Sequence, residues 1–290
     1  MERNRNMNVF NKKNISILAV MLLVFMVVGS FFDYQISQAL FNIKSPFGIF
    51  FASFGQLPAM LCFAAGGTLL FKLVDSSRKI SSFFCIVFGI FLNLLAVSAV
   101  TMDPMLYIEN MPLALSAVIA VAIVAVADIL IFKLTKESSR EQIKKFITLA
   151  ILTMFLQALI INIIKIPWGR PRMRMISVTE GASFQPWWVI GSEMKTKLMA
   201  LGVASEEFKS FPSGHTGCAA CALLLAALPL LSDRLKGKET MLLWIGVAFT
   251  IVVAFSRIIM GAHFLTDVTV GMSVTVLVIS ILMNILYKKA

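Results

Sequence analysis

The 290-residue sequence contains only two histidines, and both stand beside groups that could assist nucleophilic or acid–base chemistry. His215 follows Ser213 and Gly214, and His263 is followed four residues later by Asp267. Residues four apart share a face where a helix runs through both, and a carboxylate that accepts a hydrogen bond from one ring nitrogen leaves the other nitrogen free. The pattern predicts His263 as a nucleophile or a base, Asp267 as its partner, and His215 as an acid that protonates a departing alkoxide.

Basic side chains near the two histidine segments would suit a phosphate group. Lys165, Arg172 and Arg257 could neutralise phosphoryl oxygens, and the two arginines could do so with paired hydrogen bonds. Ser213 and Gly214 come directly before an expected helix, where free backbone N–H groups and the helix dipole favour a phosphate. These residue types predict a phosphate-binding site served by two histidines.

The elements that must position these residues are expected to be membrane helices. The chain is 59% hydrophobic and 14% charged, with a mean hydropathy of +0.88, whereas a soluble domain carries about 25% charged residues. Because about 20 apolar residues cross a bilayer as a helix, we predict an all-α, polytopic transmembrane helix bundle of about eight spans. The first run is long and has no small-x-small site, so it is not expected to be a cleaved signal peptide. The apolar runs cover residues 15–32, 57–74, 81–101, 112–134, 146–165, 214–232, 240–259 and 264–287.

Lysine and arginine predict the orientation, because they stay preferentially on the cytoplasmic side of a membrane. They gather at the amino terminus, in alternate connections and at the carboxyl terminus, so both termini are expected to be cytoplasmic. The segment 33–56, the connection 102–111, which has no basic residue, and the long connection 166–213 are then expected outside. Both histidines fall at outer ends of spans, which predicts a cell-membrane protein with its site on the extracytoplasmic face.

The connection 166–213 is itself rich in basic residues, against the charge rule. Long connections follow that rule weakly, so the predicted orientation stands. An anionic ligand would explain the basic cluster, and a solvated basic loop is the alternative. Trp187 and Trp188 in this connection would either lie at the membrane surface or pack against the helices. The net charge of +11 would indicate a nucleic-acid partner in a soluble protein, but here we expect the lipid bilayer and no nucleic acid.

The cysteines and acidic residues do not indicate a metal site. Cys218 and Cys221 form a C-x-x-C pair, which can indicate redox or metal chemistry. They lie among alanines and leucines, which favours a role in helix packing. No group of histidine, cysteine and carboxylate residues has the spacing of a zinc or magnesium site. We therefore expect no metal and no other cofactor.

Three ordered motifs resemble those of the type 2 phosphatidic acid phosphatases, a family that shares its site with the vanadium haloperoxidases. The family patterns P-S-G-H and S-R-x5-H-x3-D match residues 212–215 and 256–267 in full. The pattern K-x6-R-P is matched by Lys165 and Arg172. The resemblance covers about residues 145–287.

The first motif departs from the family pattern at its last position. Met173 stands where the family usually has proline, which affects the loop after Arg172 rather than its guanidinium. A competing alignment pairs Lys165 with Arg170 and Pro171, which keeps the proline but shortens the spacing to four. We prefer the alignment on Arg172.

The resemblance implies a phosphohistidine intermediate on His263, with Asp267 orienting that ring and His215 acting as general acid. It implies a phosphate held without metal by Lys165, Arg172, Ser213, Gly214 and Arg257. The family core usually has six spans, three of which end at the first motif, whereas five are expected here. We therefore expect two regions, namely 1–140 with four spans of unknown role and 141–290 as the catalytic membrane domain.

The expected function is hydrolysis of a membrane lipid phosphate or pyrophosphate. Undecaprenyl pyrophosphate, phosphatidylglycerol phosphate and phosphatidic acid all suit an outward-facing basic site. A lipid phosphotransferase that uses the same site is the main alternative, because the sequence does not indicate the acceptor. A non-enzymatic lipid-binding or transport protein is a third possibility, but it would not need a nucleophile and an acid. A haloperoxidase is a poor match for a chain this hydrophobic.

Overall fold

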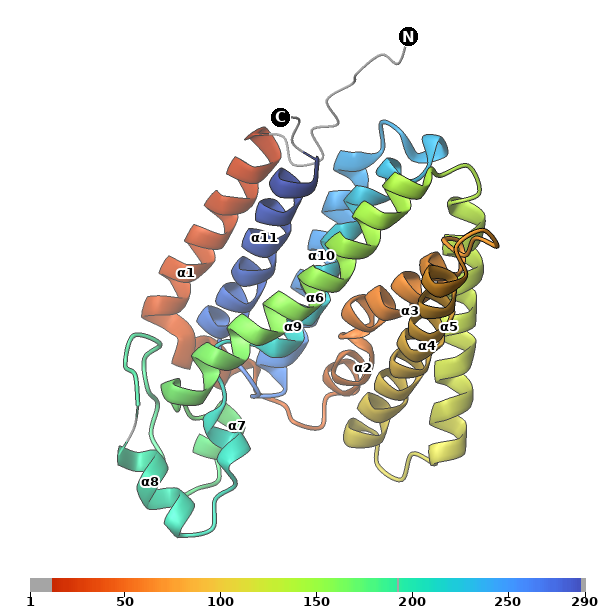
Figure 1. Ribbon diagram of the computed structural model, residues 1–290. Coiled ribbons are helices and arrows are strands. Elements are labelled where there is room, and N and C mark those ends of the chain that lie inside the picture. Colours follow the sequence, from red (N-terminus) through yellow and green to blue (C-terminus); the bar gives the residue numbers. More distant parts are fainter. Residues whose placement is uncertain (1–11, 192, 288–290) are drawn as a thin grey trace.

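The computed structural model describes residues 12–191 and 193–287, which form a bundle of helices with no strand among them (Figure 1). This architecture confirms the all-α prediction. The helices of the first half are α1 Lys12–Leu40, α2 Pro46–Phe54, α3 Leu57–Phe71, α4 Lys79–Tyr107 and α5 Leu113–Leu134. They are followed by α6 Arg140–Trp168, α7 Met173–Ile176, α8 Glu193–Ala200, α9 Gly214–Ala219, α10 Glu239–Ile259 and α11 Leu265–Tyr287. The described residues also form three 3₁₀ helices, namely η1 Ser205–Phe208, η2 Ala220–Leu230 and η3 Asp233–Leu235.

Seven helical segments in the described part of the chain are long and apolar enough to cross a membrane. They confirm a polytopic helical membrane bundle. Successive long helices run in opposite directions, so that α1 begins and α11 ends at the same end of the bundle (Figure 1). The segments are Lys12–Leu40, Pro46–Phe71, Lys79–Tyr107, Leu113–Leu134, Arg140–Ile176, Glu239–Ile259 and Leu265–Tyr287.

The predicted run 214–232 corresponds to a shorter apolar segment, Gly214–Leu230, which consists of α9 and η2. A 3₁₀ helix rises about 2.0 Å per residue against about 1.5 Å in an α-helix, so this short segment still extends over about 30 Å. Its alanines allow close contact with α10. A Cβ at Gly246 would lie only 2.6 Å from the carbonyl oxygen of Ala222, so the two backbones are in direct contact there.

The second crossing begins earlier than the apolar run 57–74 predicts. α2 begins at Pro46, where the Ser45 hydroxyl accepts a hydrogen bond from the Gly48 backbone N–H at 3.2 Å. A capping serine followed by proline is a favourable helix start, so much of the predicted connection 33–56 is helical instead. Because the chain breaks between them, α2 with 9 residues and α3 with 15 residues are each shorter than the roughly 20 residues that cross a bilayer.

Helix α6 places Lys165 in its last turn. The helix starts with a capping box, in which Ser139 and Gln142 bond each other's backbone N–H groups through their side chains. It ends at Gly169, whose φ of 67° is left-handed and therefore suits glycine. Beyond this residue, α7, α8 and η1 fold against one end of the bundle (Figure 1).

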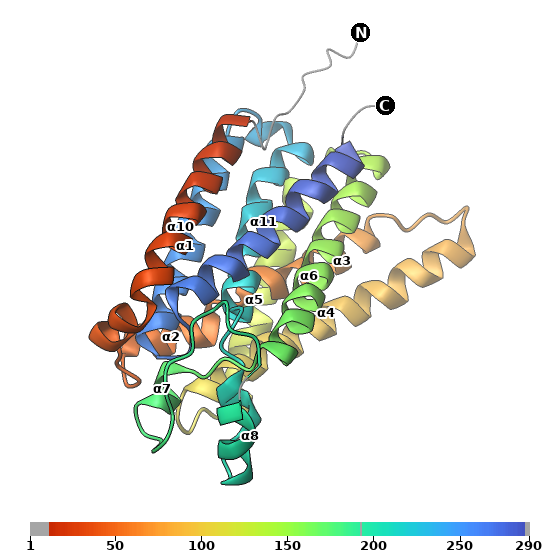
Figure 2. The same cartoon turned by 90° about the vertical axis from the view of Figure 1, so that its left-hand side faces the viewer.

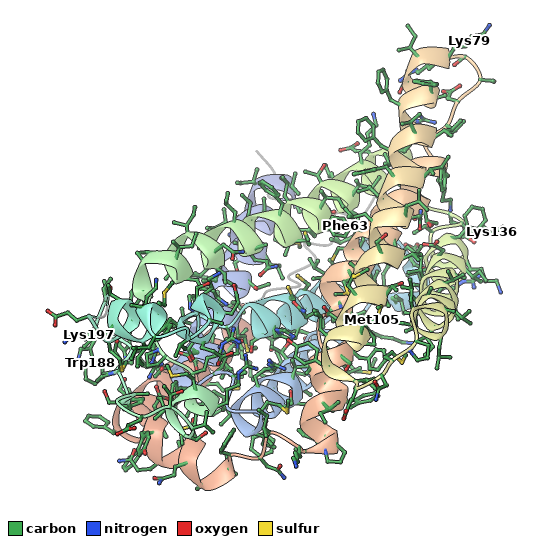
Figure 3. The ribbon with its side chains drawn as sticks, turned by 90° about the horizontal axis from the view of Figure 1, so that it is seen from below. Phe63, Lys79, Met105, Lys136, Trp188 and Lys197 are labelled. Carbon is green, nitrogen blue, oxygen red and sulfur yellow. The ribbon has the colours of Figure 1, made fainter. Side chains whose placement is uncertain are left out.

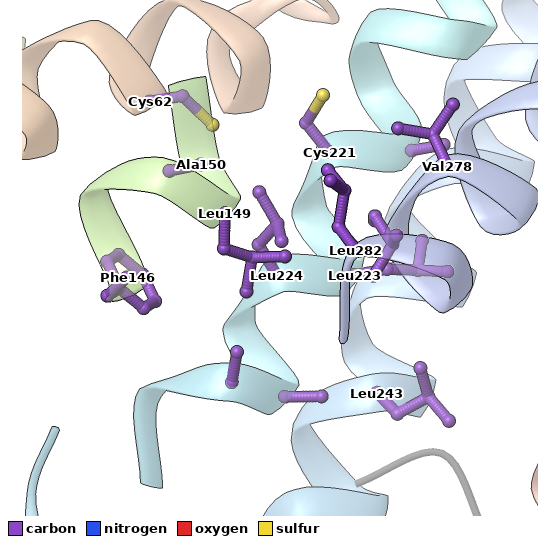
Figure 4. Close-up of a cluster of buried hydrophobic side chains, with 14 of the residues drawn as sticks. Cys62, Phe146, Leu149, Ala150, Cys221, Leu223, Leu224, Leu243, Val278 and Leu282 are labelled. Carbon is purple, nitrogen blue, oxygen red and sulfur yellow. The ribbon is translucent and has the colours of Figure 1, made fainter. Parts of the chain in front are cut away.

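The main hydrophobic core lies where α6, η2, α10 and α11 pack together, with α3 joining from the side. Figure 4 shows Cys62 of α3, Leu149 of α6, Leu223 of η2 and Leu282 of α11 in this cluster. Helix α1 packs along α11. Cys221 also lies in this apolar core, and it is free, as are the other three cysteines.

Helices α3, α4 and α5 form a second packed group beside this core. Helix α4 leans away from the rest of the molecule (Figure 2). In Figure 3 it runs from Met105, near the other helices, out to Lys79 at the far edge. The end of α4 that carries Tyr107 is therefore the end that approaches the rest of the bundle.

Candidate active site

The three motifs meet at the end of the bundle opposite the start of α1 and the end of α11 (Figure 1). Lys165 is in the last turn of α6, His215 in the first turn of α9, and Arg257 in the last turn of α10. His263 lies in the connection between α10 and α11. The antiparallel order of these helices brings residues distant in sequence to one place.

A cavity of about 170 Å³ lies at this meeting point. It is lined by the predicted residues Lys165, Arg172, Gly214, His215, Arg257 and His263, together with Gln56, Tyr107, Gln157, Ala158, Ile161, Asn162 and Cys218. Ser213 and Asp267 do not line the cavity but are fully buried behind it. The cavity therefore combines two histidines with three cationic side chains.

The guanidinium groups at this cavity have hydrogen-bond donors that nothing in the described part of the chain accepts. Nε of Arg172, and both Nε and Nη1 of Arg257, are buried and have no partner among the described residues. An unsatisfied buried donor costs about 1–3 kcal/mol, and more when it is charged. An anion with several acceptor oxygens would satisfy these donors, and a phosphoryl group is such an anion.

The first turn of α9 faces the same cavity. The Ser213 hydroxyl accepts a hydrogen bond from the Thr216 backbone N–H at 3.3 Å, so Ser213 caps the helix. Gly214 lines the cavity, and a Cβ there would lie 3.6 Å from Nζ of Lys165. The absent side chain therefore leaves space beside the lysine for a ligand oxygen.

His263 is held by a backbone carbonyl. Nδ1 lies 2.6 Å from the carbonyl oxygen of Ser210, and because a carbonyl can only accept, Nδ1 carries the hydrogen. Nε2 then keeps its lone pair, as a nucleophile requires. Burial lowers the pKa of His263 well below its ordinary value, and the nearby charges of Lys165 and Arg172 lower it further. The ring is therefore neutral at physiological pH.

Asp267 differs in position from the sequence-based expectation. Helix α11 begins at Leu265, so one helix does not run through both His263 and Asp267. The carboxylate is 3.9 Å from Nδ1, and it accepts hydrogen bonds from the Ser210 hydroxyl and from the Phe264 N–H instead. Asp267 thus acts on the histidine through Ser210, whose carbonyl holds the ring.

Arg170 does not line the cavity but lies beside the start of α11, behind His263 and Asp267. It is completely buried and pairs with both Asp267 and Asp33. It also donates to the Thr266 hydroxyl at 2.9 Å and to the Gln185 carbonyl at 2.8 Å. Since Arg172 lines the cavity and Arg170 does not, the geometry agrees with the alignment of the first motif on Arg172.

His215 has its contacts in the first half of the chain. Its Nε2 lies 3.3 Å from the carbonyl oxygen of Ala52 and 3.3 Å from the hydroxyl of Tyr107. The rings of Tyr107 and His215 meet edge to face at 5.7 Å. The candidate acid is therefore held between α9, α2 and α4.

A family model described as the PAP2 superfamily matches residues 146–290. The chain belongs to the PAP2 superfamily. No curated protein and no solved structure matches it. Membership of the PAP2 superfamily and the apolar helices together fit a membrane phosphatase. All the predicted site residues fall inside the matched segment.

Several residues at this PAP2 site were not predicted from the sequence, and these residues lie outside the segment that matches the family model. Gln56 and Tyr107 line the cavity, and Asp33 supports it through Arg170. For Asp33 there was a usable signal, because a carboxylate next to an apolar run is costly unless it has a partner. For Gln56 and Tyr107 no motif gives a signal. The division of the chain at residue 140 stays a prediction.

The remaining expectations concern metals and the tryptophans. No group of three or more histidine, cysteine and acidic residues in the described ranges could hold a metal ion. Trp187 packs inward, since its indole N–H donates to the Ser30 hydroxyl at 2.9 Å and its ring stacks on Phe211. Trp188 is exposed. Trp187 therefore follows the packing alternative, whereas a position of Trp188 at the membrane surface stays a prediction.

Proposed function

We propose that this PAP2 protein hydrolyses a lipid phosphate or pyrophosphate through a phosphohistidine on His263. The observation that carries the proposal is the cavity, where two histidines face three cations, and where buried donors of two of these cations, Arg172 and Arg257, lack a partner in the described chain. Such donors suit the charge that develops on phosphoryl oxygens during transfer. A protein that only binds a lipid would not need the paired histidines.

The first chemical step forms the covalent intermediate. The lone pair on Nε2 of His263 attacks phosphorus, and the bond from phosphorus to the leaving oxygen breaks with its electron pair staying on oxygen. His215 gives that oxygen a proton, so the lipid alcohol departs, or the lipid monophosphate in the case of a pyrophosphate. Lys165, Arg172 and Arg257 hold the other phosphoryl oxygens.

The second step releases phosphate. A water oxygen attacks phosphorus, and its proton passes to His215, which is neutral after the first step. The bond between phosphorus and Nε2 breaks, and its electron pair returns to His263. If a lipid hydroxyl took the place of water, the same site would act as a phosphotransferase.

The position of the cavity supports a lipid substrate. Asn162 of α6 lines the cavity and is also exposed on the surface. Its neighbours Leu159 and Ile163 are exposed and apolar, as expected for a helix face in contact with lipid. The phosphate of a membrane lipid would therefore reach the cations while its chains stay in the bilayer.

We also propose that the site faces outward across the cell membrane and that both termini are cytoplasmic. The connections at the end away from the cavity, 72–79, 133–145 and 234–238, are rich in lysine and arginine. Short connections of this kind follow the positive-inside rule. The connection after α4, at the cavity end, has no basic residue.

A substrate panel tests the proposed function. The full-length protein in detergent, with EDTA present, is given a lipid monophosphate, a lipid pyrophosphate or a phosphodiester lipid, with and without a lipid alcohol. We expect free phosphate from the first two lipids, none from the phosphodiester, and none from the His263→Ala variant. Phosphorylated lipid alcohol instead of free phosphate would identify a transferase. Turnover by His263→Ala, or no turnover of any lipid, would contradict the proposal.

A further inference from the structure

One wall of the catalytic cavity is built by residues outside the PAP2 match. Gln56 lies at the break between α2 and α3, and Tyr107 is the last residue of α4. Gln56 is fixed by donating from its amide nitrogen to Asp103 at 2.8 Å, one turn before Tyr107 on α4. These two segments are therefore tied to each other where they meet the cavity.

Tyr107 stands between Arg257 and His215, a phosphate-binding cation and the general acid of the proposed reaction. The guanidinium of Arg257, which faces the phosphate position, lies over the tyrosine ring at 5.3 Å from its centre. On its other side the hydroxyl reaches Nε2 of His215. The tyrosine thus connects a phosphate-binding cation with the candidate general acid.

The contacts of His215 assign its two ring nitrogens. The carbonyl oxygen of Ala52 can only accept a hydrogen bond, so Nε2 is the nitrogen that carries the fixed hydrogen. The oxygen of Tyr107 accepts from the same N–H group. Nδ1 is then the nitrogen that gives and takes the proton, and both acceptors stabilise the ring when it is positively charged.

We infer that Tyr107 is a positioning residue for the general acid, so that the amino-terminal helices complete the active site of the PAP2 domain. The inference rests on the proposed phosphatase function. As a consequence, residues of α2 and α4 position the group that protonates the leaving oxygen, while residues of the family motifs bind the phosphate. Tyr107 acts on the leaving group through His215.

The test compares two leaving groups in the Tyr107→Phe variant. Phenylalanine keeps the ring next to Arg257 and removes the hydroxyl, which contacts His215 and also Arg257. A lipid alkoxide must be protonated as it leaves, whereas p-nitrophenolate barely needs protonation. Losing one hydrogen bond to a charged ring should lower kcat on a lipid monophosphate about tenfold. The loss on p-nitrophenyl phosphate should be much smaller. Inhibition by vanadate measures separately how far the lost contact with Arg257 weakens phosphate binding, and it should weaken by less than kcat on the lipid falls.

Two controls separate failure of this inference from failure of the proposed function. Tyr34→Phe removes a hydroxyl from a ring that packs on Phe184 outside the cavity, and it should behave like the native protein. His263→Ala should abolish turnover of both substrates, and activity in this variant would overturn the proposed function itself. If His263→Ala is inactive but Tyr107→Phe loses nothing, or loses equally on both substrates, the role of Tyr107 is wrong and the phosphohistidine proposal stands.

Discussion

At the scale of single residues, the two histidines differ in which ring nitrogen is bound to the backbone. Nδ1 of His263 faces the carbonyl of Ser210, whereas Nε2 of His215 faces the carbonyl of Ala52. Each contact fixes one N–H and leaves the opposite nitrogen free to react. The same side chain can therefore serve as a nucleophile in one place and as an acid in the other.

The charge state of His263 gives a first prediction. Because burial lowers its pKa, the ring should remain neutral well below the ordinary value of about 6.5. In the proposed mechanism the neutral ring is the nucleophile, so any loss of kcat/KM that arises from His263 should begin only below pH 6.5. In the His215→Gln variant His263 is the one histidine of the chain, and NMR of its ring in tag-free protein reports its titration directly. Titration at pH 6.5 or above would contradict this description of the site.

Gly214 gives a second residue-scale prediction. A Cβ at this position meets only Nζ of Lys165 within 4 Å, so Gly214→Ala should fold normally. The methyl group would, however, occupy space next to the lysine where a phosphoryl oxygen is proposed to bind. We expect inhibition by vanadate to weaken by on the order of tenfold to a hundredfold, while the melting temperature changes little. Unchanged vanadate affinity would show that the ligand binds elsewhere.

At the scale of elements, α1 is joined by a buried ion pair to the segment that follows α6. Asp33 pairs with Arg170 at 2.9 Å and accepts from the Thr266 N–H at 3.0 Å. Arg170 in turn pairs with Asp267, which holds Ser210. A helix outside the PAP2 match therefore supports the carbonyl that orients His263.

Neutralising Asp33 should therefore affect both stability and catalysis. Removing one partner of a buried ion pair lowers the free energy of unfolding by about 3–5 kcal/mol. Asp33→Asn should lower it by most of this amount, because Arg170 is then left with Asp267 as its one carboxylate partner. Thermal unfolding in detergent and kcat on a lipid phosphate measure the two effects. Asp75→Asn is the matched control. Asp75 forms a long, partly exposed ion pair with Arg140 at 3.8 Å, so this substitution should change stability and kcat little. Equal behaviour of the two variants would contradict the supporting role of α1.

The elements also show what the sequence could predict. Long apolar runs identified most of the spans, because a helix that crosses a bilayer needs about 20 mainly apolar residues. The start of α2 at Pro46 and the 3₁₀ geometry of Ala220–Leu230 could not be predicted in this way, since they depend on local capping and on packing against α10. The motif residues were recognised from their spacing, but Tyr107 was not, because its contact with His215 depends on how α4 leans against the bundle.

At the scale of the whole molecule, the proposal requires that the catalytic end face outward. Single cysteines in a background without the four native ones can test this with a membrane-impermeant maleimide. Ser177→Cys, exposed at the cavity end, should react on intact cells. Ser76→Cys, exposed in the basic connection after α3, should react only after lysis. The opposite labelling pattern would place the site in the cytoplasm and restrict it to lipids of the inner leaflet.

The most direct test of the central claim is to locate the covalent phosphate. The native protein is mixed with a radiolabelled lipid phosphate, quenched within one turnover in alkali, in which phosphohistidine survives, and mapped by peptide. The label is expected on the peptide that contains His263, and it should be absent from His263→Ala. Turnover that leaves no label on His263, or a label on any other residue, would contradict the mechanism.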